Sequence, residues 1–184
     1  MIDMHTMTAP ILIFAIGNES RGDDALAPLL LRRLDAWLQS EGRAVDFELI
    51  EDFQLQVEHV TDMAGRRMIL FMDAGMETSA PYAFYRTKAS DFPTLYSHAL
   101  TPEAVLTVYP QIYQEAPPPA FVLCIRGEQF ELGSALSPAA ENRLEVAMDF
   151  MRSLLRETEV AAWEMQTHQP ALGDAEKHEA CAIK

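Results

Sequence analysis

The sequence contains little cysteine, no long apolar run and no cluster of basic residues. Its 184 residues include two cysteines, Cys124 and Cys181, too few for a disulfide framework. No apolar stretch approaches the roughly 20 residues that a transmembrane helix needs. The N-terminal stretch MIDMHTMTAP has neither the basic region nor the apolar region of a signal peptide. We therefore expect a soluble, cytoplasmic protein with no membrane partner.

The charge is one-sided, with 28 acidic residues against 14 basic residues and a formal net charge of −14. A protein that binds nucleic acid through the phosphates gathers Lys and Arg on one face. That pattern is missing, so we expect no nucleic-acid partner. The apolar fraction of 49% is enough for a hydrophobic core, and the length is typical of one domain.

Strand-like and helix-like segments alternate along the chain. The apolar run Ile11–Ile16 is typical of a strand buried on both faces. From Asp24 onward, leucines recur at helical spacing until Gly42. Further strands are predicted at 45–51, 68–75, 81–86 and 120–127, and further helices at 55–65, 101–113 and from Ser137 onward.

The order of these elements predicts an α/β fold with a mainly parallel sheet that helices cover on both sides. The segment Gln129–Gly133 is a candidate extension of this sheet. Beyond about Glu157 the hydrophobic period is lost. We therefore expect residues 1–157 to form a single α/β domain and residues 158–184 to form a loosely ordered C-terminal tail.

Acidic residues follow or end two of the predicted strands. The first strand leads to the pair Asp23 and Asp24, and the third contains Asp73 near its end. In open parallel sheets, ligands bind beyond the carboxyl ends of the strands, where the strand order reverses. If the order is second–first–third, Asp24 and Asp73 meet at one crevice. His98, on the loop before the helix at 101–113, can enter the same crevice.

Asp24, Asp73 and His98 together are a candidate site for a divalent metal. Carboxylate and imidazole ligands suit borderline ions such as zinc, iron or nickel. Three protein ligands leave coordination positions open for water or substrate, as catalysis or recognition of a metal requires.

Each of these residues also has a structural interpretation. Asp23 and Asp24 can simply complement the dipole of the helix that they begin, an effect of ~0.3–1 kcal/mol each. Asp73 can be a turn former at a strand end, and His98 an exposed loop residue. The other histidines are expected to be structural or solvent-facing: His5, His59, His168 and His178.

Nucleotide binding and nucleophilic catalysis have little support. The stretch GNESRG lacks the G-x-G-x-x-G spacing and the Walker lysine, and the aspartates that follow it repel phosphate. Cys124 stands inside an apolar strand, where cysteine is typically an inert core residue. No G-x-S-x-G nucleophile elbow occurs.

Four segments occur in an order that is found in a known family. In ILIFAIGNESRGDDAL, an apolar strand precedes a pattern similar to G-[IV]-G-N-x-x-x-x-D-[DE]. RRMILFMDAG is a strand that ends in Asp-Ala, and YSHALTPEAVL places a histidine before Thr-Pro and a helix. IRGEQFELGSALSPAA is a glycine-containing segment before the last helix. From about Ile11 to Leu155, the chain thus resembles the hydrogenase maturation endopeptidases, although Ala25 and Ala27 stand where relatives often have glycine.

The resemblance implies an α/β three-layer sandwich with a twisted, mostly parallel sheet of about five strands. It also implies an endopeptidase that removes the C-terminal extension of a nickel–iron hydrogenase large-subunit precursor after nickel insertion. The metal-binding residues of the family fall on Asp24, Asp73 and His98, which act through nickel that the precursor supplies. Asp23 is either a helix cap or a general base that lies next to the metal ligands without binding the metal itself.

Two other functions fit the same residues. A non-catalytic nickel-checking chaperone, or docking module, would bind the same precursor without cutting it. An unrelated metallohydrolase that acts on small molecules would need no hydrogenase partner. The mass of the precursor distinguishes the endopeptidase from the chaperone, because only the endopeptidase removes a peptide.

Overall fold

One mixed sheet forms the centre of the molecule. The computed structural model describes residues 8–90 and 100–168. Within these residues, five strands pair in the order β2-β1-β3-β5-β4. All neighbouring pairs are parallel except β4 and β5. The strands are β1 (Ile11–Ile16), β2 (Phe47–Asp52), β3 (Met68–Gly75), β4 (Tyr82–Thr87) and β5 (Ala120–Arg126).

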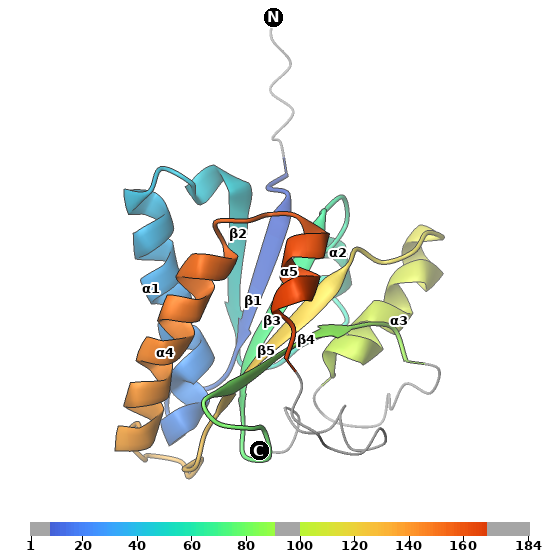
Figure 1. Cartoon of the computed structure of the whole chain (residues 1–184). Coiled ribbons are helices and arrows are strands. Elements are labelled where there is room, and N and C mark those ends of the chain that lie inside the picture. The colour runs from blue at the N-terminus through green and yellow to red at the C-terminus, as the bar shows by residue number, and fades with distance from the viewer. Residues whose placement is uncertain (1–7, 91–99, 169–184) are drawn as a thin grey trace, which may run out of the picture.

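Helices cover both faces of the sheet, with α1 and α4 on one side and α2 and α3 on the other (Figure 1). The predicted α/β three-layer sandwich with a mostly parallel sheet is confirmed. None of the described helices is long and apolar enough to cross a bilayer. The helices are α1 (Leu26–Ser40), α2 (His59–Asp62), α3 (Pro102–Tyr113), α4 (Pro138–Leu154) and α5 (Val160–Gln166), with two 3-10 helices, η1 (Gly22–Ala25) and η2 (Ala44–Asp46).

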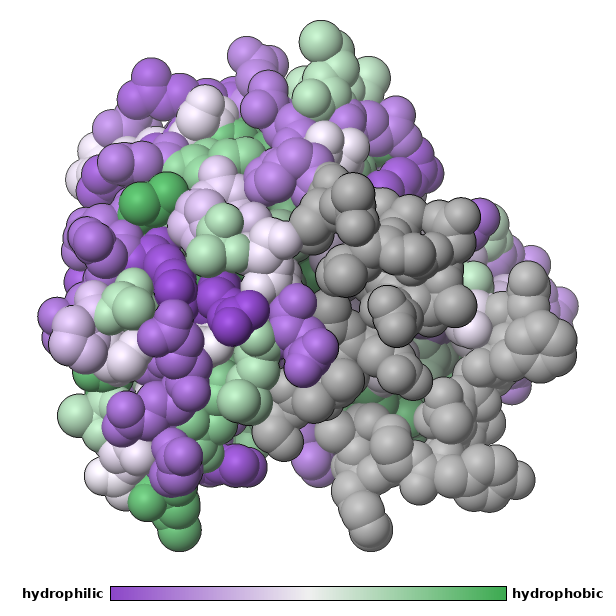
Figure 2. Space-filling model, turned by 60° about the horizontal axis from the view of Figure 1, so that its bottom comes forward, coloured by the Kyte–Doolittle hydropathy of each residue, from purple (hydrophilic) through white to green (hydrophobic). Residues whose placement is uncertain are grey.

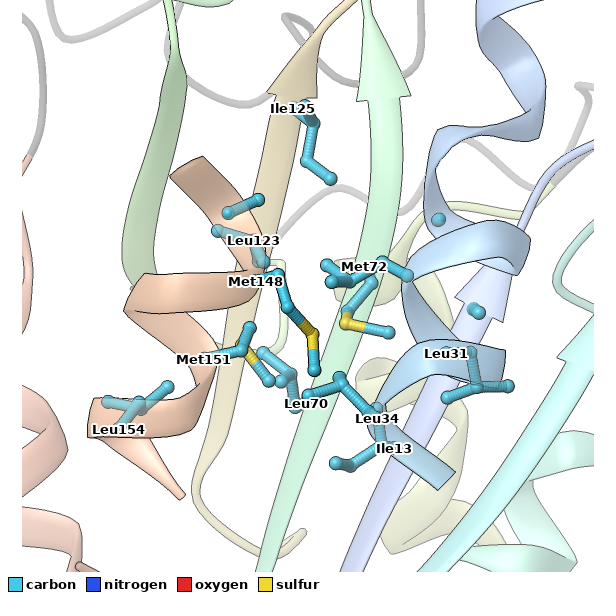
Figure 3. Packing of buried hydrophobic residues seen from close by; sticks show 14 of the residues in the cluster. Ile13, Leu31, Leu34, Leu70, Met72, Leu123, Ile125, Met148, Met151 and Leu154 are labelled. Carbon is cyan, nitrogen blue, oxygen red and sulfur yellow. The ribbon is translucent and has the colours of Figure 1, made fainter. Parts of the chain in front are cut away.

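Two hydrophobic layers hold the sheet between its helices. Successive residues of a strand point to opposite faces. Ile11 and Ile13 of β1 therefore pack towards α1 and α4, whereas Leu12 and Phe14 pack towards α2 and α3. Figure 3 shows the first layer, in which methionines and leucines of α4 meet apolar side chains of β3 and β5. Because both faces are buried along β1 and along residues 68–72 of β3, these stretches are continuous apolar runs in the sequence.

The predicted start signals of α3 and α4 are the caps that the structure uses. The Thr101 hydroxyl accepts a hydrogen bond from the Ala104 N–H at 3.2 Å. The Ser137 hydroxyl accepts one from the Ala140 N–H at 3.1 Å. In both helices a proline follows the cap, at a position where its missing N–H has no cost.

The prediction for Gln129–Gly133 was wrong, because these residues form a loop and not an extension of the sheet. Backbone groups that a strand would offer to a neighbouring strand are bound elsewhere. The N–H groups of Glu128 and Gln129 donate to the carboxylate of Asp23, at 2.8 and 3.2 Å.

The expected loose tail also differs from the structure in its first part. Residues 160–166 form α5, and the side chain of Trp163 is fully buried between the helix and the sheet. The indole packs edge-on against Phe84 and Phe121, and its N–H donates to the carbonyl of Glu157 at 2.7 Å. The folded unit therefore extends past residue 157, at least to His168. Residues 169–184 of the predicted tail lie outside the described residues.

The connections between the strands create a point where the strand order reverses. From β1 the chain passes through α1 to β2 on one side, and then returns through α2 to β3 on the other side of β1. The predicted order second–first–third is therefore present. The carboxyl ends of β1 and β3, where the order reverses, are the position at which open α/β sheets bind ligands. These ends lie at the bottom of the view in Figure 1.

Candidate active site

Asp24 and Asp73 both lie at this carboxyl edge. β1 and β3 are in parallel register up to Ala15 and Met72, so the next pair along the two strands is Ile16 and Asp73. Asp24 belongs to η1, which follows β1 after a short turn and packs against β3. The structure thus places both predicted carboxylates at the same edge of the sheet, although 49 positions separate them in the sequence.

The turn between β1 and η1 is built around Asp24. Its side chain is only 4% exposed, and its Oδ2 accepts a hydrogen bond from the Asn18 N–H at 3.0 Å. The Asn18 side chain closes the turn by accepting from the Ser20 N–H at 2.9 Å. Asn18 is a residue whose role sequence reasoning missed, although asparagine after a strand-ending glycine is a turn signal.

Gly17 allows this turn to close. A Cβ atom on Gly17 would lie 2.0 Å from the backbone oxygen of Asp24, a distance that real Cβ atoms do not adopt. Its N–H donates to the Asp52 carbonyl at 3.1 Å, which extends the contact between β1 and β2. The glycine is therefore required by the close approach of η1 to the end of β1.

Asp23 has a different task from its neighbour. It is fully buried, and its carboxylate accepts four hydrogen bonds. The donors are the Ser137 N–H at 2.7 Å, the Ser137 hydroxyl at 2.8 Å, the Glu128 N–H at 2.8 Å and the Gln129 N–H at 3.2 Å. Asp23 makes no cap bond to its own helix η1. It ties the β1–η1 turn to the β5–α4 loop and to the start of α4.

Asp73 is half-buried near the end of β3, and its Oδ1 accepts a hydrogen bond from the Ala74 N–H at 2.8 Å. By strand alternation its side chain shares a face with Phe71, which packs in the α2–α3 layer. Both candidate carboxylates are thus oriented by a backbone N–H.

A cluster of buried polar side chains lies on the face of the sheet that α2 and α3 cover. Sequence reasoning missed this cluster. The Thr87 hydroxyl of β4 donates to Glu103 of α3, and both side chains are at least nine-tenths buried. Burial raises the pKa of Tyr85 well above its usual value, and the nearby negative charges of Glu103 and Asp73 raise it further. Tyr85 therefore stays neutral and keeps a hydroxyl proton beside the carboxylates. No periodic signal marks this group, because its members come from β3, β4 and α3.

His98, the third predicted ligand, lies outside the described residues. The chain is described again from Leu100, which forms an antiparallel bridge with Leu55 in the loop after β2. Among the described residues, no group of three or more His, Cys, Asp or Glu side chains is arranged to hold a metal ion. The predicted trio, which includes His98, stays a prediction.

Two of the other histidines are described and have structural surroundings. His59 begins α2, where its Nδ1 accepts from the Gln56 N–H at 3.0 Å and its Nε2 lies 3.3 Å from Asp52 Oδ2. His168 joins the end of the described chain to β4, since its N–H donates to the Phe84 carbonyl at 2.9 Å. Cys124 is buried inside β5. His5 and His178 lie outside the described residues.

Comparison with known proteins identifies the fold. No family model and no curated protein matches the sequence. Twenty chains of solved structures do match the three-dimensional structure. The hydrogenase maturating endopeptidase HybD from E. coli aligns over 79% of this chain and 91% of its own, with 22% identity and a TM-score of 0.59.

Two further solved structures support the same comparison. The [NiFe] hydrogenase maturation protease HycI from Thermococcus kodakarensis covers 83% of this chain and 96% of its own, with 19% identity and a TM-score of 0.61. Hydrogenase 2 maturation peptidase from a Thaumarchaeota archaeon covers 79% and 97%, with 17% identity and a TM-score of 0.54. The chain therefore has the fold of the hydrogenase maturation endopeptidases.

Proposed function

We propose that this protein is a hydrogenase maturation endopeptidase, which removes the C-terminal extension of a nickel–iron hydrogenase large-subunit precursor. The observation that carries the proposal is the position of Asp24 and Asp73. Asp73 lies near the carboxyl end of β3, and Asp24 lies in η1, which follows β1 and packs against β3, on a fold shared with proteases of this kind. The sequence resemblance supports the same function through its four segments.

Nickel enters this proposal as part of the substrate. Asp24 and Asp73 offer carboxylate oxygens and His98 offers an imidazole nitrogen, a donor set that suits a borderline divalent ion. The backbone N–H groups of Asn18 and Ala74 hold the two carboxylates in place. Recognition of nickel that the precursor already carries makes cleavage conditional on a loaded precursor.

The chemistry is hydrolysis of a peptide bond by water. Contact with the metal positions the precursor, and a metal can also polarise a carbonyl or activate water. Asp23 acts as a clamp and not as a base, because four hydrogen-bond donors occupy its buried carboxylate. The reaction takes place in the cytoplasm, and its macromolecular partner is the precursor and neither a membrane nor a nucleic acid.

Processing of a nickel-loaded precursor in vitro tests the site. Asp24→Asn, Asp73→Asn and His98→Ala are each expected to abolish cleavage while leaving the thermal unfolding transition in place. Asp35→Asn, an exposed residue of α1, is the matched control and is expected to cleave normally. Cleavage at the unaltered rate by all three site variants would contradict the assignment.

Mass spectrometry of the precursor tests the activity itself. An endopeptidase lowers the mass of the precursor by that of its C-terminal extension. An unchanged mass together with stable binding would identify a nickel-checking chaperone instead. Hydrolysis of small substrates in the absence of any precursor would identify an unrelated metallohydrolase.

A further inference from the structure

A groove of about 520 Å³ opens at the carboxyl edge of the sheet, close in the sequence to both acidic positions. Three loops build it: the β1–η1 turn, the segment after β3, and the loop between β5 and α4. The residues that line it are Arg21, Met76, Glu128, Phe130, Glu131 and Leu132.

The wall of this groove is held in place before any ligand arrives. The Arg21 Nε–H donates to the Phe130 carbonyl at 3.1 Å, and Phe130 is itself 6% exposed. Backbone hydrogen bonds join the two loops, from Gly133 to Ser20 at 2.7 Å, from Gly22 to Ser134 at 3.2 Å and from Asp23 to Gln129 at 2.7 Å. A preformed wall lowers the ordering cost of binding.

Exposed apolar side chains concentrate at this edge. Within the described residues, eight large hydrophobic side chains are exposed, and four of them follow the carboxyl ends of β2, β3 and β5. These four are Phe53, Val57, Met76 and Leu132, and the last is 79% exposed. Figure 2, which brings this edge forward, shows hydrophobic residues at the surface among hydrophilic ones. Two of these four, Met76 and Leu132, line the groove. Apolar side chains that line a groove mark a binding surface more strongly than the same residues scattered singly.

The charges around the groove favour a cationic ligand. Glu131 lines it, and Glu77 stands next to Met76 in an exposed position, whereas Glu128, which also lines it, is paired with Arg143 at 2.7 Å. Arg21 is the cation among the lining residues, and its Nε–H is directed at a carbonyl group of the wall. The net charge of −14 for the whole chain acts in the same direction.

We propose that this groove binds an extended polypeptide segment in which an apolar residue adjoins a Lys or Arg. The apolar side chain contacts Met76 and Leu132, and the cation faces Glu131 and Glu77. The inference rests on the proposed function, since the segment is then part of the precursor that runs past Asp24 during cleavage. It adds to that function a recognition element that is separate from the metal.

Nuclear magnetic resonance of the full chain, labelled with nitrogen-15, tests the inference directly. The probe is a short capped Gly/Ser peptide that carries one leucine next to one arginine. Shift changes are expected at the backbone amides of Arg21, Met76 and residues 128–132. Two matched peptides, with glutamate in place of arginine and with serine in place of leucine, are expected to bind more weakly.

Variants of the groove identify the contacts. Leu132→Ser is expected to weaken the peptide roughly tenfold, because an apolar contact is lost. Glu131→Lys is expected to weaken it roughly three- to fivefold in low salt, as for an exposed ion pair. Both side chains are exposed, so the fold is retained. Met165→Ser, which changes an exposed residue of α5, is the matched control and leaves binding unchanged.

Several results would overturn the inference. These are shift changes away from the groove, no shift changes at all, or equal binding of the glutamate peptide. Groove shifts that depend on protein concentration without peptide would show that a second copy of the chain occupies the groove.

The result of the peptide-binding test can be distinguished from the result of the cleavage test. Peptide binding requires neither nickel nor cleavage, so it can succeed if the protease assignment fails. Conversely, if the precursor is cleaved, Leu132→Ser is expected to raise KM and leave kcat unchanged. Cleavage with an unaltered KM would reject the groove and retain the protease.

Discussion

The carboxylate of Asp23 accepts hydrogen bonds from both the N–H and the hydroxyl of Ser137, at 2.7 and 2.8 Å, across 114 positions of the sequence. Ser137 is also the cap of α4. A single buried carboxylate thus fixes the turn that carries Asp24, the loop that lines the groove, and the start of a helix.

Asp23→Asn is therefore expected to lower the free energy of unfolding by about 2–4 kcal/mol. The amide replaces one acceptor oxygen by a donor that faces other donors. Ser137→Ala, which keeps the carboxylate and its remaining bonds, is expected to cost only about 1–2 kcal/mol. Urea unfolding followed by tryptophan fluorescence measures both changes, and equal stability of Asp23→Asn and the unaltered protein would refute the clamp.

Gly17→Ala tests the close approach of η1 to β1. The new Cβ would meet the Asp24 carbonyl oxygen at 2.0 Å, so the turn must move. We expect a loss of at least about 3 kcal/mol, at the upper end of overpacking effects, together with loss of precursor processing. Gly42→Ala is the control, because nothing lies within 4 Å and only its φ of +68° opposes alanine, at roughly 1–2 kcal/mol. Similar losses for both variants would contradict the steric argument.

Alkaline pH is expected to destabilise the protein through its buried tyrosines. Burial, and then the hydrogen bond to Glu115, raise the pKa of Tyr109 to about 12. A tyrosine with a raised pKa contributes stability that is complete below its unfolded pKa of about 10 and is lost as the pH rises through the folded value. The free energy of unfolding should therefore fall between about pH 10 and about pH 12. Tyr109→Phe should reduce this fall. Urea unfolding at a series of pH values measures the free energy of unfolding of both proteins, and an equal fall in the two would contradict the prediction.

Truncation after Glu157 tests where the folded unit ends. It removes Trp163, which is fully buried against Phe84 and Phe121. We expect this truncation, and Trp163→Ala alone, to lower the free energy of unfolding by about 3–5 kcal/mol. Met165→Ala on the same helix is 84% exposed and should change it by less than about 0.5 kcal/mol. If the truncated chain is as stable as the full chain, the folded domain ends at residue 157 after all.

The strands and most helices could be predicted from the sequence because their signals are local. β1 and most of β3 are apolar runs, and α1 has leucines at helical spacing. Thr101 and Ser137, each followed by a proline, are recognisable N-cap residues of α3 and α4. The expected strand order and the neighbouring positions of Asp24 and Asp73 follow from the rules for parallel sheets. The assignment of His98 to the same site stays a prediction.

The errors arose where a weak local pattern met a specific distant partner. Residues 160–166 have little hydrophobic periodicity, but the buried indole of Trp163 packs on the sheet and holds the helix there. Gln129–Gly133 resembles a strand, but the Asp23 carboxylate takes the backbone donors at its start.

The sequence by itself determined the layers, the direction of the strands and the edge at which the acids stand, because hydrophobic period and chain connectivity suffice for these. Only the tertiary structure decided which groups each carboxylate of the adjacent pair contacts. Asp23 and Asp24 are adjacent and chemically identical, but Asp23 accepts from four donors of residues 128–137, whereas Asp24 accepts from the Asn18 N–H in its own turn. The role of Asp23 depends on contacts with residues more than a hundred positions away, which no local pattern encodes.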